Sequence, residues 1–225
     1  MKKRIIRGII VFAVLLLAPQ ITNAQGTTYL SNLSQSSARN RAVGSDAWLA
    51  VGFETGNNAS GYVLDSIQLA MIDSSGSPNA FAVMLYSAIG QGDYLPGNSF
   101  VTLNGSLSPV TGGIYTYTTS SSTILSPNTA FFMVLTSGTT IANGTYNWSY
   151  ANTFSYNSAG NWRAPLGQSA VDDYQSSNGL NWSFVGGPSQ FAITATPIPE
   201  PSASWLFLLG GGVFIHVRTR IRHTA

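Results

Sequence analysis

The chain has 225 residues, of which 44% are hydrophobic and only 8% are charged, and it contains no cysteine. Its formal net charge of +2 comes from its two ends, because between Gln25 and Thr196 three arginines face seven acids, a net charge of −4. A nucleic-acid partner is therefore excluded, since phosphate neutralisation requires clustered lysines and arginines, and no disulfide framework can form.

The first segment has the pattern of a secretory signal peptide. Four basic residues within the first seven positions precede an apolar run, Gly8–Ala18, and a stretch of small residues ends at Ala24. We predict a signal peptide over residues 1–24 with cleavage between Ala24 and Gln25. An uncleaved anchor is the alternative, although the apolar run is short for a membrane span. The pattern predicts export.

Residues 25–196 form the predicted exported body. Residues 25–40 are rich in serine, asparagine and glutamine, so we expect a loose lead-in or one short edge strand. Beyond it, apolar residues alternate along short segments that turn-forming residues separate, as in half-buried strands. The expected strands are 47–53, 62–72, 81–85, 100–103, 113–119, 130–136, 146–150, 180–185 and 190–196. No segment has helical periodicity, so we predict one all-β domain, an antiparallel, jelly-roll-like β-sandwich.

Within this body, 130–136 stands apart from the other predicted strands. It is an almost continuous apolar run rather than an alternating one, which is typical of a central strand that is buried on both faces.

Catalytic residue types are scarce in the body. Both histidines, His216 and His223, lie in the C-terminal tail, so serine–histidine, cysteine–histidine and histidine–metal chemistry are excluded from the body. A carboxylate pair remains as the basis of a remote alternative, a glycan hydrolase using Glu54 and the adjacent Asp172 and Asp173. Neighbouring aspartates in a loop are more often solvated or bound to calcium. We therefore predict no enzyme, no catalytic or metal site and no cofactor.

An asparagine–tryptophan pair occurs three times, ending at Trp148, Trp162 and Trp182. An indole face beside an amide suits a sugar, because the apolar face of the sugar stacks on the ring while its hydroxyl groups meet the amide. We expect Trp148 and Trp182 to fill the core between the sheets. Trp162, between Asn161 and Arg163, is expected to be more exposed, which makes these three residues the candidate glycan contact.

The C-terminal tail, 197–225, contains three features in order. Pro199, Glu200 and Pro201 are followed by an uncharged apolar segment of 16 residues, 202–217. As a helix this segment would reach roughly 24 Å, slightly less than a hydrocarbon core, and three glycines at 210–212 suit a temporary anchor. The basic residues that follow it are expected in the cytoplasm: Arg218, Arg220 and Arg222.

This tail resembles the PEP-CTERM sorting signal, whose bearers are substrates of exosortases, membrane-embedded enzymes of Gram-negative bacteria. The resemblance implies cleavage near Pro199-Glu200-Pro201, transient anchoring in the inner membrane, and delivery to the cell surface or extracellular matrix. An ordinary tail anchor is the alternative, but it leaves the Pro-Glu-Pro sequence unexplained.

Several short segments of the body resemble the choice-of-anchor R domain of bacterial surface proteins. They are Val43–Trp48, Gly61–Ile67, Gly113–Tyr117 and Tyr146–Tyr150. That resemblance supplies no catalytic residues. The expected function is a non-enzymatic surface or matrix protein with an exosortase as its processing partner. A module that binds extracellular polysaccharide is the runner-up.

Overall fold

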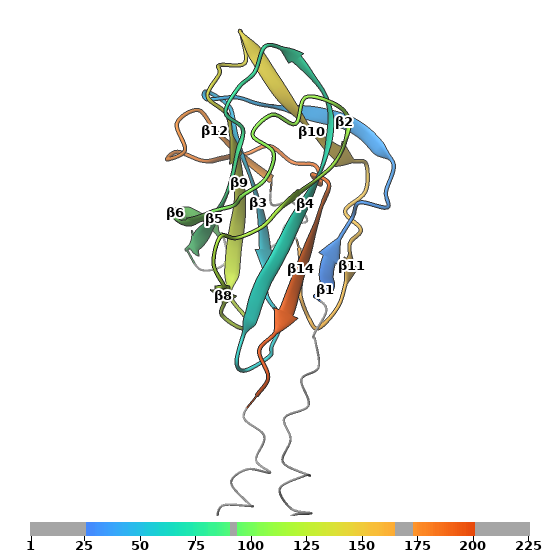
Figure 1. Ribbon diagram of the computed structural model, residues 1–225, viewed down its shortest axis with the longest axis vertical. Coiled ribbons are helices and arrows are strands. Elements are labelled where there is room, and N and C mark those ends of the chain that lie inside the picture. Colours follow the sequence, from blue (N-terminus) through green and yellow to red (C-terminus); the bar gives the residue numbers. More distant parts are fainter. Residues whose placement is uncertain (1–25, 91–93, 165–172, 201–225) are drawn as a thin grey trace, which may run out of the picture.

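The computed structural model describes residues 26–90, 94–164 and 173–200, and in these ranges the chain forms strands and no helix. Accordingly, none of the described segments is a helix able to cross a membrane. Two antiparallel sheets pack against each other, which confirms the predicted all-β, sandwich-like fold (Figure 1). The predicted signal peptide, Ala24, Gln25, Pro201, the span 202–217 and Arg218, Arg220 and Arg222 lie outside the described residues.

The larger sheet is organised around β4. Its order is β11-β1-β14-β4-β10-β2, and β7 and β8 also pair with β4. Ile67 and Leu69 each have one partner on β14 and another on β7, so these strands flank β4 on opposite sides. The strands of this sheet are β1 (Thr27–Ser31), β2 (Ser37–Val43), β4 (Tyr62–Gly76), β7 (Gly113–Tyr117), β8 (Thr123–Leu125), β10 (Gly144–Ala151), β11 (Asn157–Ser158) and β14 (Phe191–Pro197).

The smaller sheet has the order β13-β12-β3-β9-β5-β6. All seven residues of β9 are buried, and β9 lies between β3 and β5, which confirms the prediction of a central strand buried on both faces. The strands of this sheet are β3 (Trp48–Glu54), β5 (Ala82–Ile89), β6 (Leu95–Thr102), β9 (Ala130–Thr136), β12 (Asp173–Ser176) and β13 (Ser183–Phe184).

The core lies between the two sheets and is built from the residues whose alternation predicted the strands. Because side chains alternate between the faces of a strand, every second residue can reach the same core. The inward-facing residues are Leu49, Val51 and Phe53; Ile67, Leu69 and Met71; Phe81, Val83 and Leu85; and Phe191, Ile193 and Ala195, as predicted.

The structure departs from the predicted strands where the sequence is polar. The expected lead-in contains β1 and the first part of β2, and β2 continues to Val43 with the sequence SARNRAV. A strand at the end of a sheet needs backbone pairing more than apolar side chains, and β2 pairs with β10 through six registered positions. Of the predicted strand 180–185, only Ser183–Phe184 is a strand, and the prediction missed β8, β11 and β12.

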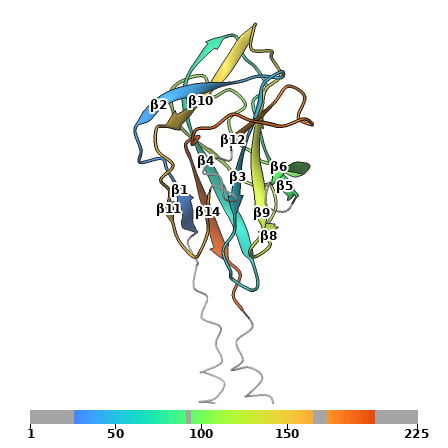
Figure 2. The same cartoon turned by 180° about the vertical axis from the view of Figure 1, so that it is seen from behind.

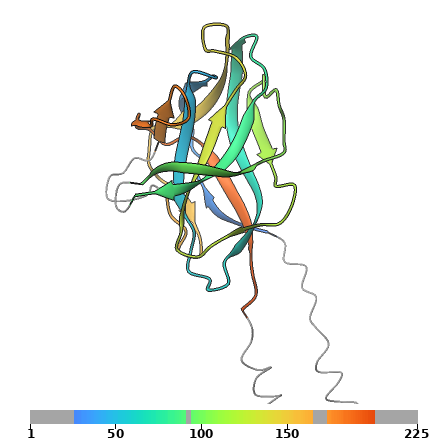
Figure 3. The same cartoon turned by 90° about the vertical axis from the view of Figure 1, so that its left-hand side faces the viewer.

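The first strand of the body begins, and its last strand ends, at the same pole. Thr27, at the start of β1, pairs with Ala195, close to the end of β14. The views from behind and from the side show the same arrangement, with β14 ending at the lower pole of the body (Figures 2 and 3). The first and the last described residues, Gly26 and Glu200, therefore lie toward the same pole of the body.

Candidate functional site

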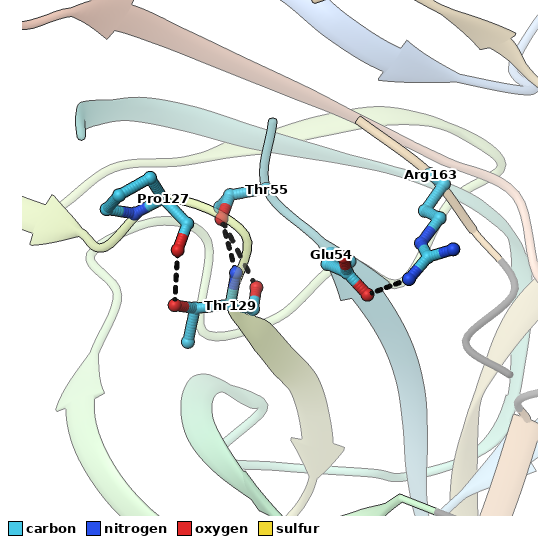
Figure 4. A network of polar contacts seen from close by, with 5 residues as sticks. All are labelled: Glu54, Thr55, Pro127, Thr129 and Arg163. Atoms are coloured by element: carbon cyan, nitrogen blue, oxygen red, sulfur yellow. Dashed lines mark hydrogen bonds and ion pairs between the residues drawn. The ribbon is translucent and has the colours of Figure 1, made fainter. Parts of the chain in front are cut away.

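Arg163 is fixed at the edge of the smaller sheet by its backbone and its side chain. It forms an isolated antiparallel bridge with Glu54, through backbone hydrogen bonds of 2.8 and 3.1 Å. Its Nη2 also donates to the Glu54 carboxylate over 2.6 Å (Figure 4). The same end of β3 is held by Thr55, whose Oγ1 donates to the carbonyl of Ser126 over 2.6 Å and accepts a hydrogen bond from the Thr129 backbone N–H. The C-terminal end of β3 is therefore held by backbone and side-chain contacts, and we call this region the junction.

Trp162 lies inside this junction, and its predicted exposure is wrong. The side chain is only 2% exposed. Its ring stacks on Tyr29 at 5.0 Å and on Phe53 at 6.0 Å between centroids, and it meets Tyr62 edge-on at 5.1 Å. A ring enclosed in this way has no face left for a sugar, so the predicted contact of Trp162 with Asn161 and Arg163 is not formed as a glycan surface.

The backbone explains why a Gly-Asn sequence directs the tryptophan inward. Gly160 and Asn161 have φ angles of 57° and 63°, so two consecutive residues adopt the left-handed conformation. Glycine and asparagine tolerate this conformation better than other residues. A Cβ at position 160 would also lie 2.8 Å from the Tyr29 ring. The turn leaves the Asn161 side chain exposed and buries the next one.

The other two asparagine–tryptophan pairs lie in different environments. Trp148 is fully buried in the core, and its Nε1 donates to the Gln190 carbonyl over 2.9 Å, which confirms its predicted core position. Trp182 is only half-buried and packs on the outer face of the smaller sheet, so its predicted place in the core between the sheets is wrong. The three pairs are therefore not grouped into one surface.

Trp182 belongs to a second apolar cluster that sequence reasoning missed. At the centre of this outer face, Phe132 and Val134 of β9 are buried beside Ala50 of β3. The half-buried aromatic residues packed around them are Trp48, Tyr94, Tyr174 and Trp182. The sequence did contain a signal for this cluster. The unbroken apolar run of β9 means that apolar side chains must pack against both of its faces. We call this set the outer aromatic cluster.

Asp173 is the second feature that the sequence did not reveal. It is paired in register with Val51, on the core-facing side of β12, and is 3% exposed. One carboxylate oxygen accepts hydrogen bonds from the backbone N–H and the hydroxyl of Ser189, at 3.1 and 2.6 Å. Burial raises the pKa of Asp173 to about 7, while the Ser189 hydroxyl, Arg41 and the Ser189 N–H oppose that rise.

These positions decide what the candidate acids can do. Glu54 is engaged by Arg163 and Asp173 by Ser189, while Asp172 lies outside the described residues. Across 26–90, 94–164 and 173–200, no group of three or more histidine, cysteine, aspartate or glutamate side chains could hold a metal ion. Asp173 is buried in the body rather than solvated in a loop, which corrects that expectation.

The described part of the tail continues directly from β14. Ile198 is half-buried, whereas Pro199 and Glu200 are exposed. Ile198 donates its N–H to the Gly61 carbonyl over 3.0 Å, and a Glu200 carboxylate oxygen accepts the Ala59 N–H over 3.2 Å. The first two residues of the Pro-Glu-Pro sequence are thus on the surface, next to the folded body.

Comparisons with protein-family models, with curated proteins and with solved structures found no match to this chain.

Proposed function

We propose that this chain is a non-enzymatic, exported cell-surface or extracellular-matrix protein that an exosortase-type enzyme processes near Pro199-Glu200-Pro201. The observation that carries the proposal is the position of Pro199 and Glu200. They are exposed immediately after the last strand, at the pole where β1 also begins. A processing enzyme at a membrane would meet this site without unfolding the sandwich.

The finer parts of this proposal follow from the sequence. A signal peptide over residues 1–24 delivers the chain, the segment 202–217 anchors it in the inner membrane until it is cut, and the basic end stays in the cytoplasm. We further propose that the body, 25–196, is a jelly-roll-like sandwich of the choice-of-anchor type. A structural role suits a body in which the two described candidate acids are occupied, Glu54 by an ion pair and Asp173 by buried hydrogen bonds.

Replacing Pro199, Glu200 and Pro201 together by alanine is expected to leave the uncut chain in the inner membrane. The reason is that the substitution removes the sequence on which processing depends while the two sheets remain intact. The measurement is the intact mass of the protein recovered from membrane and surface fractions. Ser202→Ala is the neighbouring control and should be processed normally. Release of the same shortened protein from the triple variant would refute the proposal.

A second function, polysaccharide binding, is favoured by one observation. The Nε1 of Trp182 is buried and has no hydrogen-bond partner among residues 26–90, 94–164 and 173–200, although an indole N–H normally finds one when buried. Its neighbour in sequence, Asn181, is exposed, and Trp182 itself lies at the margin of the outer aromatic cluster. A sugar hydroxyl could accept the indole hydrogen bond there. This candidate replaces Trp162 by Trp182 as the glycan contact.

If this second function is right, Trp182→Ala should weaken retention on the matrix polysaccharide about threefold to tenfold, because the indole hydrogen bond to the sugar is lost. Leu180→Ala is the matched control, since Leu180 is 80% exposed in the same hairpin and carries no ring. The measurement is a binding isotherm on isolated matrix polysaccharide. Equal retention of both variants, or no saturable binding by the wild type, would rule this site out.

A further inference from the structure

The turn Asn58–Gly61, between β3 and β4, holds the chain just beyond β14. The Asn58 side-chain Nδ2 donates to the Ile198 carbonyl over 3.0 Å and to the Gly61 carbonyl over 2.7 Å. The Gly61 carbonyl also accepts the Ile198 N–H over 3.0 Å. Both backbone hydrogen-bonding groups of Ile198 are therefore used by the body.

The same turn contacts the acidic residue of the Pro-Glu-Pro sequence. The Ala59 N–H donates to Glu200 Oε1 over 3.2 Å. A carboxylate that accepts a backbone N–H forms a charge-assisted hydrogen bond. The turn thus binds this segment in two places, at the backbone of Ile198 and at the side chain of Glu200.

The turn is also held by contacts that do not involve the tail. Gly61 donates its N–H to the Asn58 carbonyl over 2.8 Å, and the Asn58 N–H donates to the Tyr62 hydroxyl over 3.2 Å. Gly61 has a φ of 80°, and a Cβ at this position would lie 2.6 Å from the Leu125 carbonyl oxygen, so the position requires glycine. Since the Tyr62 side chain is only 2% exposed, the turn rests on the core. A site that is already ordered loses little entropy on binding.

We propose that the Asn58–Gly61 turn is a binding site for the chain's own Ile198–Glu200 segment and competes with the processing enzyme for it. This inference rests on the proposed function. An enzyme that takes an extended peptide by strand addition needs the backbone N–H and carbonyl groups of that peptide. In the docked state those of Ile198 are occupied, as is one carboxylate oxygen of Glu200. Cleavage then proceeds from the undocked state, and its rate falls with the fraction of molecules that are docked.

The first test measures docking itself on the full chain in detergent, purified from a host without the processing enzyme. Within 197–201 the three prolines have no N–H, so Ile198 and Glu200 supply the exchanging amides of this segment, and residue-resolved exchange follows the Ile198 amide. Asn58→Ala should raise its exchange rate about tenfold, because two hydrogen bonds from one side chain are lost. Asn57→Ala is the matched control: Asn57 is the exposed neighbour and should leave the rate unchanged.

A second variant removes the Glu200 contact alone. Ala59 follows the first residue of the turn, a position at which proline is favoured, so Ala59→Pro deletes the N–H donor and is compatible with the turn. A smaller rise in Ile198 exchange is expected, about twofold to threefold. Unchanged exchange in both Asn58→Ala and Ala59→Pro would overturn the binding site.

The second test follows processing in cells by pulse-chase labelling. Asn58→Ala should be cut several times faster than the wild type and than Asn57→Ala. Faster exchange with unchanged or slower cutting would overturn the competition and leave the proposed function standing. Failure of the proposed function is recognised separately, because the wild type and the triple alanine variant at 199–201 would then be released in the same form. In that case the proposed competition with the enzyme is refuted as well, while the exchange experiment still decides whether the turn binds the segment.

Discussion

Replacing Trp162 by alanine is expected to lower the free energy of unfolding by about 3–5 kcal/mol, the range for truncating a buried aromatic residue. The ring is 2% exposed and is stacked between Tyr29 and Phe53, with Tyr62 against its edge. Removing it opens a cavity where the two sheets meet, because Tyr29 and Tyr62 belong to the larger sheet and Phe53 to the smaller one. The rigid strands cannot close that space.

The measurement is urea unfolding followed by far-ultraviolet circular dichroism, which does not depend on the tryptophan signal. Arg163→Ala is the matched control at the next position. It removes an ion pair whose arginine side chain is 63% exposed, and such pairs contribute about 0–1 kcal/mol. A Trp162→Ala loss no larger than that of Arg163→Ala would show that the ring does not join the sheets.

The parts of the fold that could be predicted from the sequence are those in which side-chain pattern and burial coincide. Leu49, Val51 and Phe53 alternate because one face of β3 meets the core, and the same reasoning places Ile67 and Leu69 on β4. The period of two is a local property, so no knowledge of the partner strand is needed. The continuous run of β9 likewise predicted its central position.

The strands that escaped prediction are stabilised by pairing rather than by side-chain pattern. β2 carries two arginines and an asparagine and is held by registered backbone pairing with β10. β12 follows the residues 165–172, which the structure does not describe, and its sequence DYQS has no alternation of apolar residues. Every residue has a backbone carbonyl acceptor and every residue except proline has an N–H donor, so polar strands leave little trace in a sequence.

In the candidate site, too, local sequence pattern is informative and contacts distant in sequence are not visible. Pro199 and Glu200 lie on the surface, and the sorting role that the local order of the tail indicates stays a prediction. Trp162 and Trp182 were misplaced, in opposite directions, because their burial depends on contacts distant in sequence: Tyr29 for one and the face of β3 and β9 for the other. A neighbouring glycine or asparagine indicates a turn but does not say which way the next side chain points.

Asp173 is expected to make the protein less stable as the pH rises from about 4 to about 7. Burial is the main cause that raises the pKa of this carboxyl from 3.8 to about 7. The folded state therefore binds the proton more tightly than the unfolded state does. The contribution of the protonated Asp173 carboxyl to stability is complete below the unfolded pKa, near 4, and is lost as the pH rises through 7. At 1.36 kcal/mol for each pKa unit, the loss can reach about 4 kcal/mol.

The test compares the wild type with Asp173→Asn, which keeps the shape and an acceptor oxygen for Ser189 but cannot ionise. The stability of the wild type minus that of the variant should fall by about 2–4 kcal/mol between pH 4 and pH 8, because only the wild type must bury a charge at high pH. Ser189→Ala should extend the fall to higher pH, since its hydroxyl is one of the groups that hold the pKa of Asp173 down. A difference that rises with pH would mean that Arg41 outweighs burial and that Asp173 is a stabilising buried anion. Urea unfolding at a series of pH values decides between these outcomes.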